Sequence, residues 1–393
     1  MSSIKQEKAL SCCRNVIVSL PVLNVGGTEI QTLNLARVLV SAGYHVTICC
    51  YYEYDVGIVR KFEAVGAEVL LMKYERISGL WHLAKGLIRF FKEKKPDIVH
   101  VQYIAPGLIP ILAAKLSGIP TVFATVHQPG IPYGLKVKLF LRIGSSLCKT
   151  FFCVSKSVEK SWFGNSEIFN PKNVNRKRQH FTIYNAVDVS AITHAVGSAN
   201  LDHLIMTLAL DGCHVVGIAG RLRKEKGQAI LLDAMSQVIK KVPEVKIVVI
   251  GDGPDRKQLE TRAETLGIAD HILWLGIKEP EETLQLYSIM DVVVVPSLFE
   301  GFGLTAAEAM ASGLPVVASD VDGLREVIKD GVTGYLVPFG DSNEMAKRLI
   351  ELLSDPSKAQ AMGKVGRKRV KQQFSMERFT EATLGAYRYF CQH

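Results

Sequence analysis

Short apolar runs alternate with helical stretches along nearly the whole chain, and this alternation restricts the possible folds more than any other feature. Apolar runs separated by helices are typical of strands that are buried on both faces and pair in parallel. In the first half they are Asn15–Leu20, His45–Tyr51, Glu68–Tyr74, Ile98–Gln102, Thr121–His127, Thr150–Ser155 and Phe181–Asn185, and in the second half Val215–Ala219, Lys246–Ile250, Ile272–Leu275, Val292–Pro296, Val316–Ser319 and Tyr335–Pro338. The sequence therefore predicts an α/β protein with two doubly wound, Rossmann-like parallel sheets.

The chain is too long for a single ordinary core, since it has 393 residues. We expect a first domain over residues 1–188 and a second over residues 213–374. Residues 189–212 show no clear sheet pattern and are expected to link the two domains. Ligands of doubly wound sheets bind at the carboxyl ends of the strands, so the active cleft is expected between the domains.

The net charge of +9 is concentrated in one segment. Ten Lys and Arg residues lie between Lys136 and Arg178, against only Glu159 and Glu167. Apolar residues alternate with the cations from Gly134 to Phe152, which fits a surface lying on an anionic membrane leaflet or, equally, a core-facing helix with solvated cations. We therefore expect segment 134–178 either to contact an anionic surface or to form a solvated face; nucleic acid is disfavoured because no binding motif accompanies the charge.

The cysteine pattern indicates a protein in a reducing compartment. None of the eight cysteines forms a Cys-x-x-Cys pair, so we expect free thiols. The start of the chain, Met1 to Arg14, lacks a signal-peptide core, and the apolar stretch Ile104 to Ile119 is interrupted by Pro106, Pro110 and Lys115. A cytoplasmic protein without a transmembrane helix is expected.

A glycine-rich turn, Glu300-Gly301-Phe302-Gly303-Leu304, follows the strand Val292–Pro296 and opens a helix that contains Glu308. The small residues let a phosphate or a sugar approach the backbone N–H groups of a helix N-terminus. A carboxylate one turn later would repel phosphate but accepts hydrogen bonds from hydroxyls, as on a ribose. The alternative is that the glutamates only complement the helix dipole.

Two further turns carry similar chemistry. Gly26 and Gly27 follow the first strand and open a helix, where a ligand can approach the backbone. Gly220 and Arg221 follow the first strand of the second half, and Lys226 comes five residues later. An Arg and a Lys at a strand's carboxyl end can bind a diphosphate together, although each alone is more often a surface cation.

Several motifs are excluded or discounted. Gly251-Asp252-Gly253 follows a strand, but Arg256 occupies the place of the third glycine of a dinucleotide fingerprint. Asp320-Val321-Asp322 has the form of an Asp-x-Asp metal motif, yet two aspartates in a turn are common by chance, and we expect no metal there.

Taken together, these positions identify a resemblance to the family-four retaining glycosyltransferases of the GT-B fold, from about Val16 to Tyr389. The resemblance rests on Gly26-Gly27-Thr28-Glu29, His127, Asn185-Ala186-Val187-Asp188, Gly220-Arg221 with Lys226-Gly227, Gly251-Asp252-Gly253-Pro254, Glu300-Gly301-Phe302-Gly303-Leu304 with Glu308, Gly323-Leu324-Arg325-Glu326-Val327-Ile328 and Asp330-Gly331-Val332-Thr333-Gly334. The chain departs from the family's pattern at two places. Arg325 stands where the family often has proline, and Gln128-Pro129-Gly130 follows His127 in place of the commoner glycine-rich continuation.

The resemblance implies transfer of a hexose-type sugar from a nucleoside diphosphate donor, with retention and without a metal or a cofactor, to a saccharide or lipid-linked acceptor in cell-surface polysaccharide or glycoconjugate synthesis. It implies that Arg221 and Lys226 neutralise the leaving diphosphate and that Glu308 holds the ribose. Glu300 and His127 would face the donor sugar. The remaining positions would supply backbone contacts to the donor: Gly26, Gly27, Gly220, Gly251, Gly301, Phe302, Gly303 and Leu304. It also implies that a last helix, about 375–393, packs on the first domain.

Two other functions remain as alternatives. A catalytically silent partner subunit of the same fold would be favoured by loss of Arg221, Lys226 or Glu300, and all three are present. A sugar-nucleotide epimerase would need additional acid and base carboxylates near the sugar, which the sequence does not identify.

Overall fold

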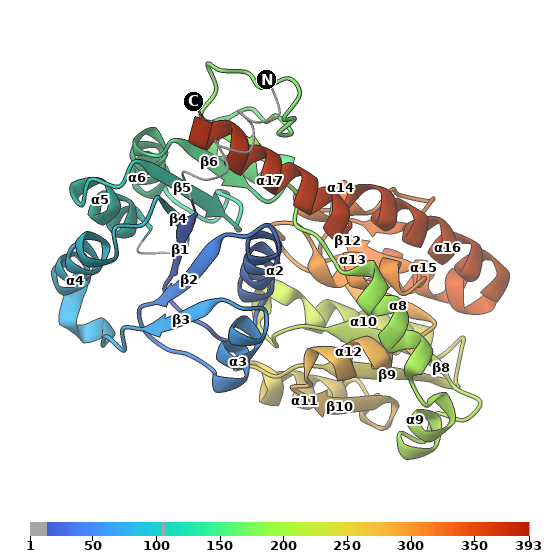
Figure 1. Cartoon of the computed structure of the whole chain (residues 1–393). Helices are drawn as coiled ribbons and strands as arrows, with labels where there is room; N and C mark the ends of the chain where they lie inside the picture. The colour runs from blue at the N-terminus through green and yellow to red at the C-terminus, as the bar shows by residue number, and fades with distance from the viewer. Residues whose placement is uncertain (1–13, 104–106, 393) are drawn as a thin grey trace. The chain divides into compact units, whose positions relative to one another are not determined.

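The computed structural model describes residues 14–103 and 107–392, which form two compact units (Figure 1). Unit 1 contains the described residues up to Ala186 and those from Glu377 onward. Unit 2 runs from Val187 to Met376. Each unit has its own sheet and its own apolar core.

Unit 1 contains a seven-stranded sheet in the order β3-β2-β1-β4-β5-β6-β7, with every neighbouring pair parallel. The strands are β1 Asn15–Leu20, β2 His45–Cys50, β3 Glu68–Leu71, β4 Ile98–Tyr103, β5 Thr121–Val126, β6 Thr150–Cys153 and β7 His180–Thr182. Five of them, β2, β3, β5, β6 and β7, end before their predicted last residues. At β6 the reason is local, because the Ser155 hydroxyl accepts from the Val158 N–H (3.1 Å) and so caps the following helix.

The helices of unit 1 are α2 Gly27–Ser41, α3 Val56–Ala64, α4 Gly79–Lys94, α5 Leu108–Leu116, α6 Leu135–Leu147, α7 Lys156–Phe163 and α17 Met376–Gln392. Helices α4, α5 and α6 pack against one another in that order (Figure 1). The last helix, α17, inserts Tyr387 and Phe390 into the core, where the Tyr387 ring lies 5.0 Å from that of Phe123. Burial of these aromatic rings joins α17 to the sheet of unit 1.

Unit 2 contains a six-stranded parallel sheet in the order β10-β9-β8-β11-β12-β13. The strands are β8 His214–Ala219, β9 Val245–Ile250, β10 Ile272–Gly276, β11 Val292–Val295, β12 Val316–Ser319 and β13 Gly334–Val337. The helices are α8 Val189–Ser198, α9 Leu201–Thr207, α10 Gln228–Val238, α11 Arg256–Thr265, α12 Pro280–Leu286, α13 Leu304–Ala311, α14 Asp322–Val327, α15 Ser342–Ser354 and α16 Pro356–Gln373.

Residues 189–212, expected to be a linker, contain two helices instead. The side chains of Asp188 and Asn200 cap these helices, α8 and α9, by accepting from the N–H groups of Ala191 and His203. Helix α8 packs on α12 and α13, so this segment belongs to unit 2. The sequence pattern missed it because a helix covering other helices leaves no sheet periodicity.

Both sheets reverse their strand order once, and this reversal marks where ligands of such folds bind. The reversal lies between β1 and β4 in unit 1 and between β8 and β11 in unit 2. The loops that leave these strands carry most of the residues singled out in the sequence. None of the helices in the described ranges is long and apolar enough to cross a membrane.

Candidate functional site

An ion pair lies at the strand reversal of unit 2. Lys226, in the loop after β8, places Nζ 2.6 Å from Oε1 of Glu300, in the loop after β11. The Ser297 hydroxyl donates to the same carboxylate oxygen at 2.8 Å. Two loops more than 70 residues apart in sequence are thereby joined by charge at the carboxyl edge of the sheet. This is where the topology places a ligand.

Backbone packing fixes the same loops. Gly227 has a φ of +70°, and a Cβ on it would lie 1.9 Å from the carbonyl oxygen of Pro296. Gly251, after β9, has a φ of +123°, and a Cβ there would lie 2.1 Å from the Gly220 carbonyl oxygen. Only glycine meets both the dihedral and the space requirement. The loops after β8, β9 and β11 therefore interlock through their main chains.

Arg221 presents its guanidinium at the same edge. Its carbonyl oxygen accepts from the Gln228 side chain at 3.0 Å, which fixes the main chain. Its side chain is exposed, and among the described residues it has no ion-pair partner. An unpaired guanidinium on a fixed backbone is suited to binding a phosphate in two-point contact.

Helix α13 begins at Leu304, after Gly303, and carries Glu308 one turn later. The Tyr287 hydroxyl donates to Oε2 of Glu308 at 3.4 Å. Burial raises the pKa of Glu308 to about 7, although this hydrogen bond acts in the opposite direction. Phe302, just before the helix, is buried with its ring 5.2 Å from that of Phe374. Glu308 is thus a carboxyl group that changes charge near neutral pH at a helix N-terminus.

The Asp-x-Asp turn contains its own cation. Arg325 Nε lies 2.5 Å from Asp320 Oδ1, and Arg325 Nη1 lies 3.0 Å from Asp322 Oδ1. The guanidinium holds the pKa of Asp320 below its usual range. Arg325 therefore balances both carboxylates, and among the residues described no cluster of three or more metal-ligating side chains occurs.

In unit 1, Gly26 and Gly27 lie where β1 turns into α2. Gly26 is the extended residue before the helix, and a Cβ on it would lie 2.6 Å from Oε2 of the buried Glu29. The Glu29 carboxylate thus lies so close to the turn that any residue with a side chain at position 26 would clash with it. A carboxyl group beside this turn can accept a hydrogen bond from a hydroxyl ligand.

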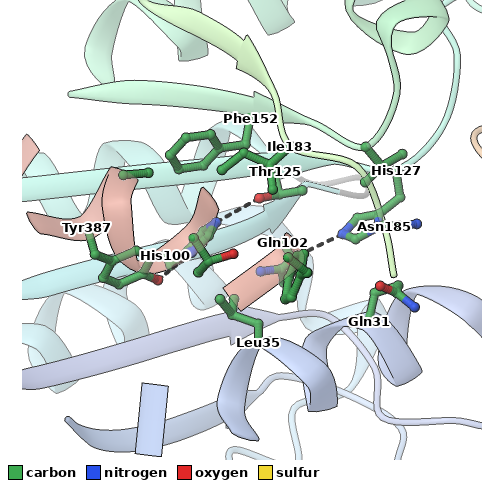
Figure 2. A pocket seen from close by; sticks show the side chains of 14 residues that line it. Gln31, Leu35, His100, Gln102, Thr125, His127, Phe152, Ile183, Asn185 and Tyr387 are labelled. Atoms are coloured by element: carbon green, nitrogen blue, oxygen red, sulfur yellow. Dashed lines mark hydrogen bonds between the residues drawn. The ribbon is translucent and has the colours of Figure 1, made fainter. Parts of the chain in front are cut away.

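His127 follows β5 and lines a cavity of about 40 Å³ (Figure 2). Its Nε2 lies 2.7 Å from Oε1 of Gln102, so Nε2 carries the proton and Nδ1 presents a lone pair. Nδ1 is cut off from solvent and has no hydrogen-bond partner in the described residues. Burial lowers the pKa of His127 to about 4, which keeps the ring neutral. His127 therefore holds one buried acceptor without a partner, which a hydroxyl or N–H donor would satisfy.

A second histidine lines the same cavity. His100, on β4, bonds through Nδ1 to the Tyr387 hydroxyl and through Nε2 to the Thr125 hydroxyl, both at 2.7 Å (Figure 2). Burial lowers the pKa of His100 to about 3. His100 and Gln102 were not predicted from the sequence. They occupy alternate positions of the otherwise apolar strand Ile98–Tyr103, and this period of two was the available signal.

The predicted site residues therefore form two groups, one in each unit. Unit 2 brings together its predicted residues at the ends of β8, β9 and β11 and in the first turns of α13: Gly220, Arg221, Lys226, Gly251, Glu300, Gly301, Phe302, Gly303, Leu304 and Glu308. Unit 1 holds Gly26, Gly27 and His127 at the ends of β1 and β5.

Comparison with known families accounts for most of the chain. Residues 25–190 match the model of Glycosyltransferase Family 4, and residues 209–369 match that of Glycosyl transferases group 1. The D-inositol 3-phosphate glycosyltransferase of Corynebacterium urealyticum is 41% identical over 155 residues, which is 38% of this chain and 37% of that protein. The match thus spans less than half of that relative's length. The uncharacterized glycosyltransferase MJ1178 of Methanocaldococcus jannaschii is 26% identical over 90% of this chain and 92% of its own.

Solved structures share the fold. Anabaena Alr3699/HepE in complex with UDP-glucose superposes with a TM-score of 0.80 at 20% identity, covering 95% of this chain and 99% of its own. Sucrose-phosphate synthase from Thermosynechococcus elongatus gives a TM-score of 0.75 at 21% identity, covering 96% and 99%. These likenesses confirm the predicted GT-B class of two parallel-sheet α/β domains.

Proposed function

Because the chain belongs to the group 1 glycosyltransferases, we propose that it is a metal-independent enzyme that transfers a sugar from a nucleoside diphosphate sugar to a saccharide or lipid-linked acceptor, with retention of configuration. The observation that carries this proposal is the Lys226–Glu300 pair, 2.6 Å apart beside the exposed Arg221 at the strand reversal of unit 2. Such an edge, with paired and unpaired cations, suits a diphosphate leaving group.

The cations act on the leaving group. Negative charge grows on the departing phosphate as the glycosidic bond breaks, so a fixed cation stabilises the transition state more than the ground state. An ammonium has three N–H donors, so Lys226 can keep Glu300 and still reach a phosphate oxygen. Arg221 supplies a second positive charge, and the backbone N–H groups at the start of α13 supply a third, partial one. Together these positive groups can stabilise the charge on the leaving diphosphate, which a divalent ion does in other transferases.

The carboxylates and the histidine act on hydroxyls. Once it is ionised, Glu308 accepts hydrogen bonds from the ribose hydroxyls. Glu300 accepts hydrogen bonds from hydroxyls of the donor sugar. In unit 1, the lone pair on His127 Nδ1 accepts a hydrogen bond from a sugar hydroxyl, and the neutral ring does not compete for phosphate. Gly26 and Gly27 permit a ligand to lie close to the main chain.

A donor screen followed by product analysis tests the proposal. Thermal shift with UDP-, GDP-, ADP- and dTDP-sugars identifies the donor, starting from UDP-glucose because the Anabaena structure holds it. Turnover is then measured for Lys226→Ala and for Arg262→Ala, which breaks the surface pair Arg262–Asp233 (2.6 Å) as a matched control. NMR of the product, with and without chelator, reads the anomer and the metal requirement. A β-linked product from an α-donor, or activity that depends wholly on added metal, would falsify the mechanism.

The two alternative functions have less support. A silent partner subunit has no use for a fixed Lys226–Glu300 pair and a free Arg221 guanidinium. An epimerase would need acid and base groups around the sugar in addition to Glu300 and Glu308. We propose a cytoplasmic place of action, peripheral to the membrane, with segment 134–178 near an anionic surface and a role in polysaccharide or glycoconjugate synthesis.

A further inference from the structure

The helix layer α4–α5–α6 of unit 1 has an unusual distribution of charge. Between residues 76 and 158 only Glu93 and Asp97 are acidic. Both lie at the amino edge of the sheet, because Glu93 is in the last turn of α4 and Asp97 directly precedes β4. The exposed side chains of the layer include six cations: Lys85, Arg89, Lys92, Lys115, Lys136 and Arg142. The layer is therefore strongly positive, and its acids are confined to one edge.

Helix α6 turns apolar side chains toward solvent. Leu135, Leu139 and Ile143, spaced four residues apart, are 86%, 59% and 42% exposed, whereas Leu141 on the opposite side is buried. The sequence left open whether these apolar residues face the core, and their exposure shows that they do not. Lys136 lies beside the stripe and is also exposed. An apolar stripe between cations is the pattern of a helix that lies in a membrane interface.

Helix α4 shows the same combination. Trp81 is 83% exposed in its first turn, and Lys85, Arg89 and Lys92 follow at four-, eight- and eleven-residue spacing on the same side. Ile77, just before the helix, is 90% exposed. Tryptophan side chains are favoured at the level of lipid headgroups. Because α4 and α6 both pack on α5, the two helices belong to one face of unit 1 (Figure 1).

We propose that this face of the α4–α5–α6 layer docks the protein on an anionic lipid bilayer. This inference rests on the proposed function, because of the two acceptor classes proposed there it selects the lipid-linked one. Charge complementarity identifies the occupant: six exposed cations and interspersed apolar groups match lipid phosphates and the acyl boundary below them. An acidic protein partner is the competing occupant, and the test separates the two.

Trp81 provides an internal reporter. The chain has three tryptophans, and of these Trp162 is buried and Trp274 belongs to unit 2. The full-length protein is titrated with phosphatidylglycerol/phosphatidylcholine vesicles and with pure phosphatidylcholine vesicles at low and high salt. We expect sedimentation with the anionic vesicles only, weakened by salt, with a blue shift of tryptophan emission. Trp81→Phe removes the shift while sedimentation persists.

Charge variants complete the test. The triple change Lys85→Glu, Arg89→Glu and Lys136→Glu should weaken vesicle binding by on the order of a hundredfold. The matched triple Lys240→Glu, Lys241→Glu and Lys364→Glu, on exposed residues of unit 2, should bind nearly as the wild type does. Wild-type protein that stays in the supernatant with anionic vesicles at low salt overturns the proposal and leaves an acidic protein as the better occupant. Sedimentation without a shift at Trp81 also overturns it, because another face then binds. Hydrolysis of a water-soluble donor, measured in parallel, should be unchanged in the first triple, so failure of docking is distinguishable from failure of the proposed transferase.

Discussion

The two units share one topology but differ in the chemistry at the carboxyl ends of their strands. In unit 2 the loops hold opposite charges 2.6 Å apart and interlock through glycines. In unit 1 the corresponding edge holds a cavity lined by neutral groups, where two histidines are kept uncharged by burial. Topology thus decides where a ligand binds, and the side chains decide whether phosphate or hydroxyl is preferred there.

The largest expected effect is on the charged edge. Lys226→Ala or Arg221→Ala should cost about 2–5 kcal/mol of transition-state stabilisation, because a fixed cation is lost where charge develops. Glu300→Gln should also impair transfer while the fold survives, since it removes charge but not volume. Steady-state kinetics measure the loss in kcat/KM, with Arg262→Ala as the control. Near-normal turnover of Arg221→Ala and Glu300→Gln would refute the assignment of these residues.

Backbone packing at the same edge gives the next effect. Gly227→Ala should destabilise unit 2 by roughly 3 kcal/mol, because the new Cβ meets the Pro296 carbonyl oxygen and the residue has a positive φ. Gly267→Ala is the matched control: its φ is +67°, and a Cβ there meets nothing within 4 Å, so about 1 kcal/mol is expected. Chemical denaturation followed at Trp274 compares the two variants. Equal losses would mean that only the dihedral matters and that the loops do not interlock.

The neutral edge should respond to acid. The pKa values of His100 and His127 are lowered to about 3 and about 4 in the folded state, so the unfolded chain binds protons first. Their contribution to stability is present above pH 6.5 and is lost as pH falls toward 4. For the fully buried His100 the loss reaches about 2 kcal/mol at pH 5.

Hydrogen exchange of β4 and α17 amides between pH 7 and pH 5 follows this loss. His100→Gln and His127→Gln, which do not titrate, should flatten the pH dependence of unit 1 and leave that of unit 2 unchanged. A wild-type unit 1 with constant protection over this range would contradict the buried neutral state of the two rings.

The contrast also explains what the sequence allowed us to predict. The strands, the family and the charged turns were accessible because apolar runs and Gly/Arg/Lys/Glu spacings are local patterns. The cavity was not, since Gln102, His127 and Tyr387 come from elements far apart in the chain and meet only after the sheet forms. Segment 189–212 was missed for a similar reason: its first helix, α8, packs on α12 and α13, which lie roughly a hundred residues later.

The smallest expected effect concerns Glu308. The pKa of Glu308 is raised to about 7 in the folded state, so the folded protein holds this proton more tightly than the unfolded chain does. The resulting contribution to stability is present below pH 4.5 and is lost as pH rises through 7. This pH dependence has the opposite sign to that of the two histidines. If ionised Glu308 binds the ribose, the affinity for a nucleoside diphosphate should fall several-fold between pH 8 and pH 6. Glu308→Gln should retain only the pH dependence of the ligand itself. Identical pH profiles for the two proteins would show that Glu308 does not contact the ligand as a carboxylate.

Isothermal titration with a nucleoside diphosphate that lacks the transferred sugar tests the division between the units most directly. The nucleotide whose sugar conjugate binds in the screen is titrated into wild type, Lys226→Ala and His127→Ala at pH 8. Our account predicts that Lys226→Ala weakens binding at least tenfold and that His127→Ala binds as the wild type does, because the histidine cavity recognises hydroxyls rather than phosphate. The reverse result, with binding lost in His127→Ala and retained in Lys226→Ala, would contradict it.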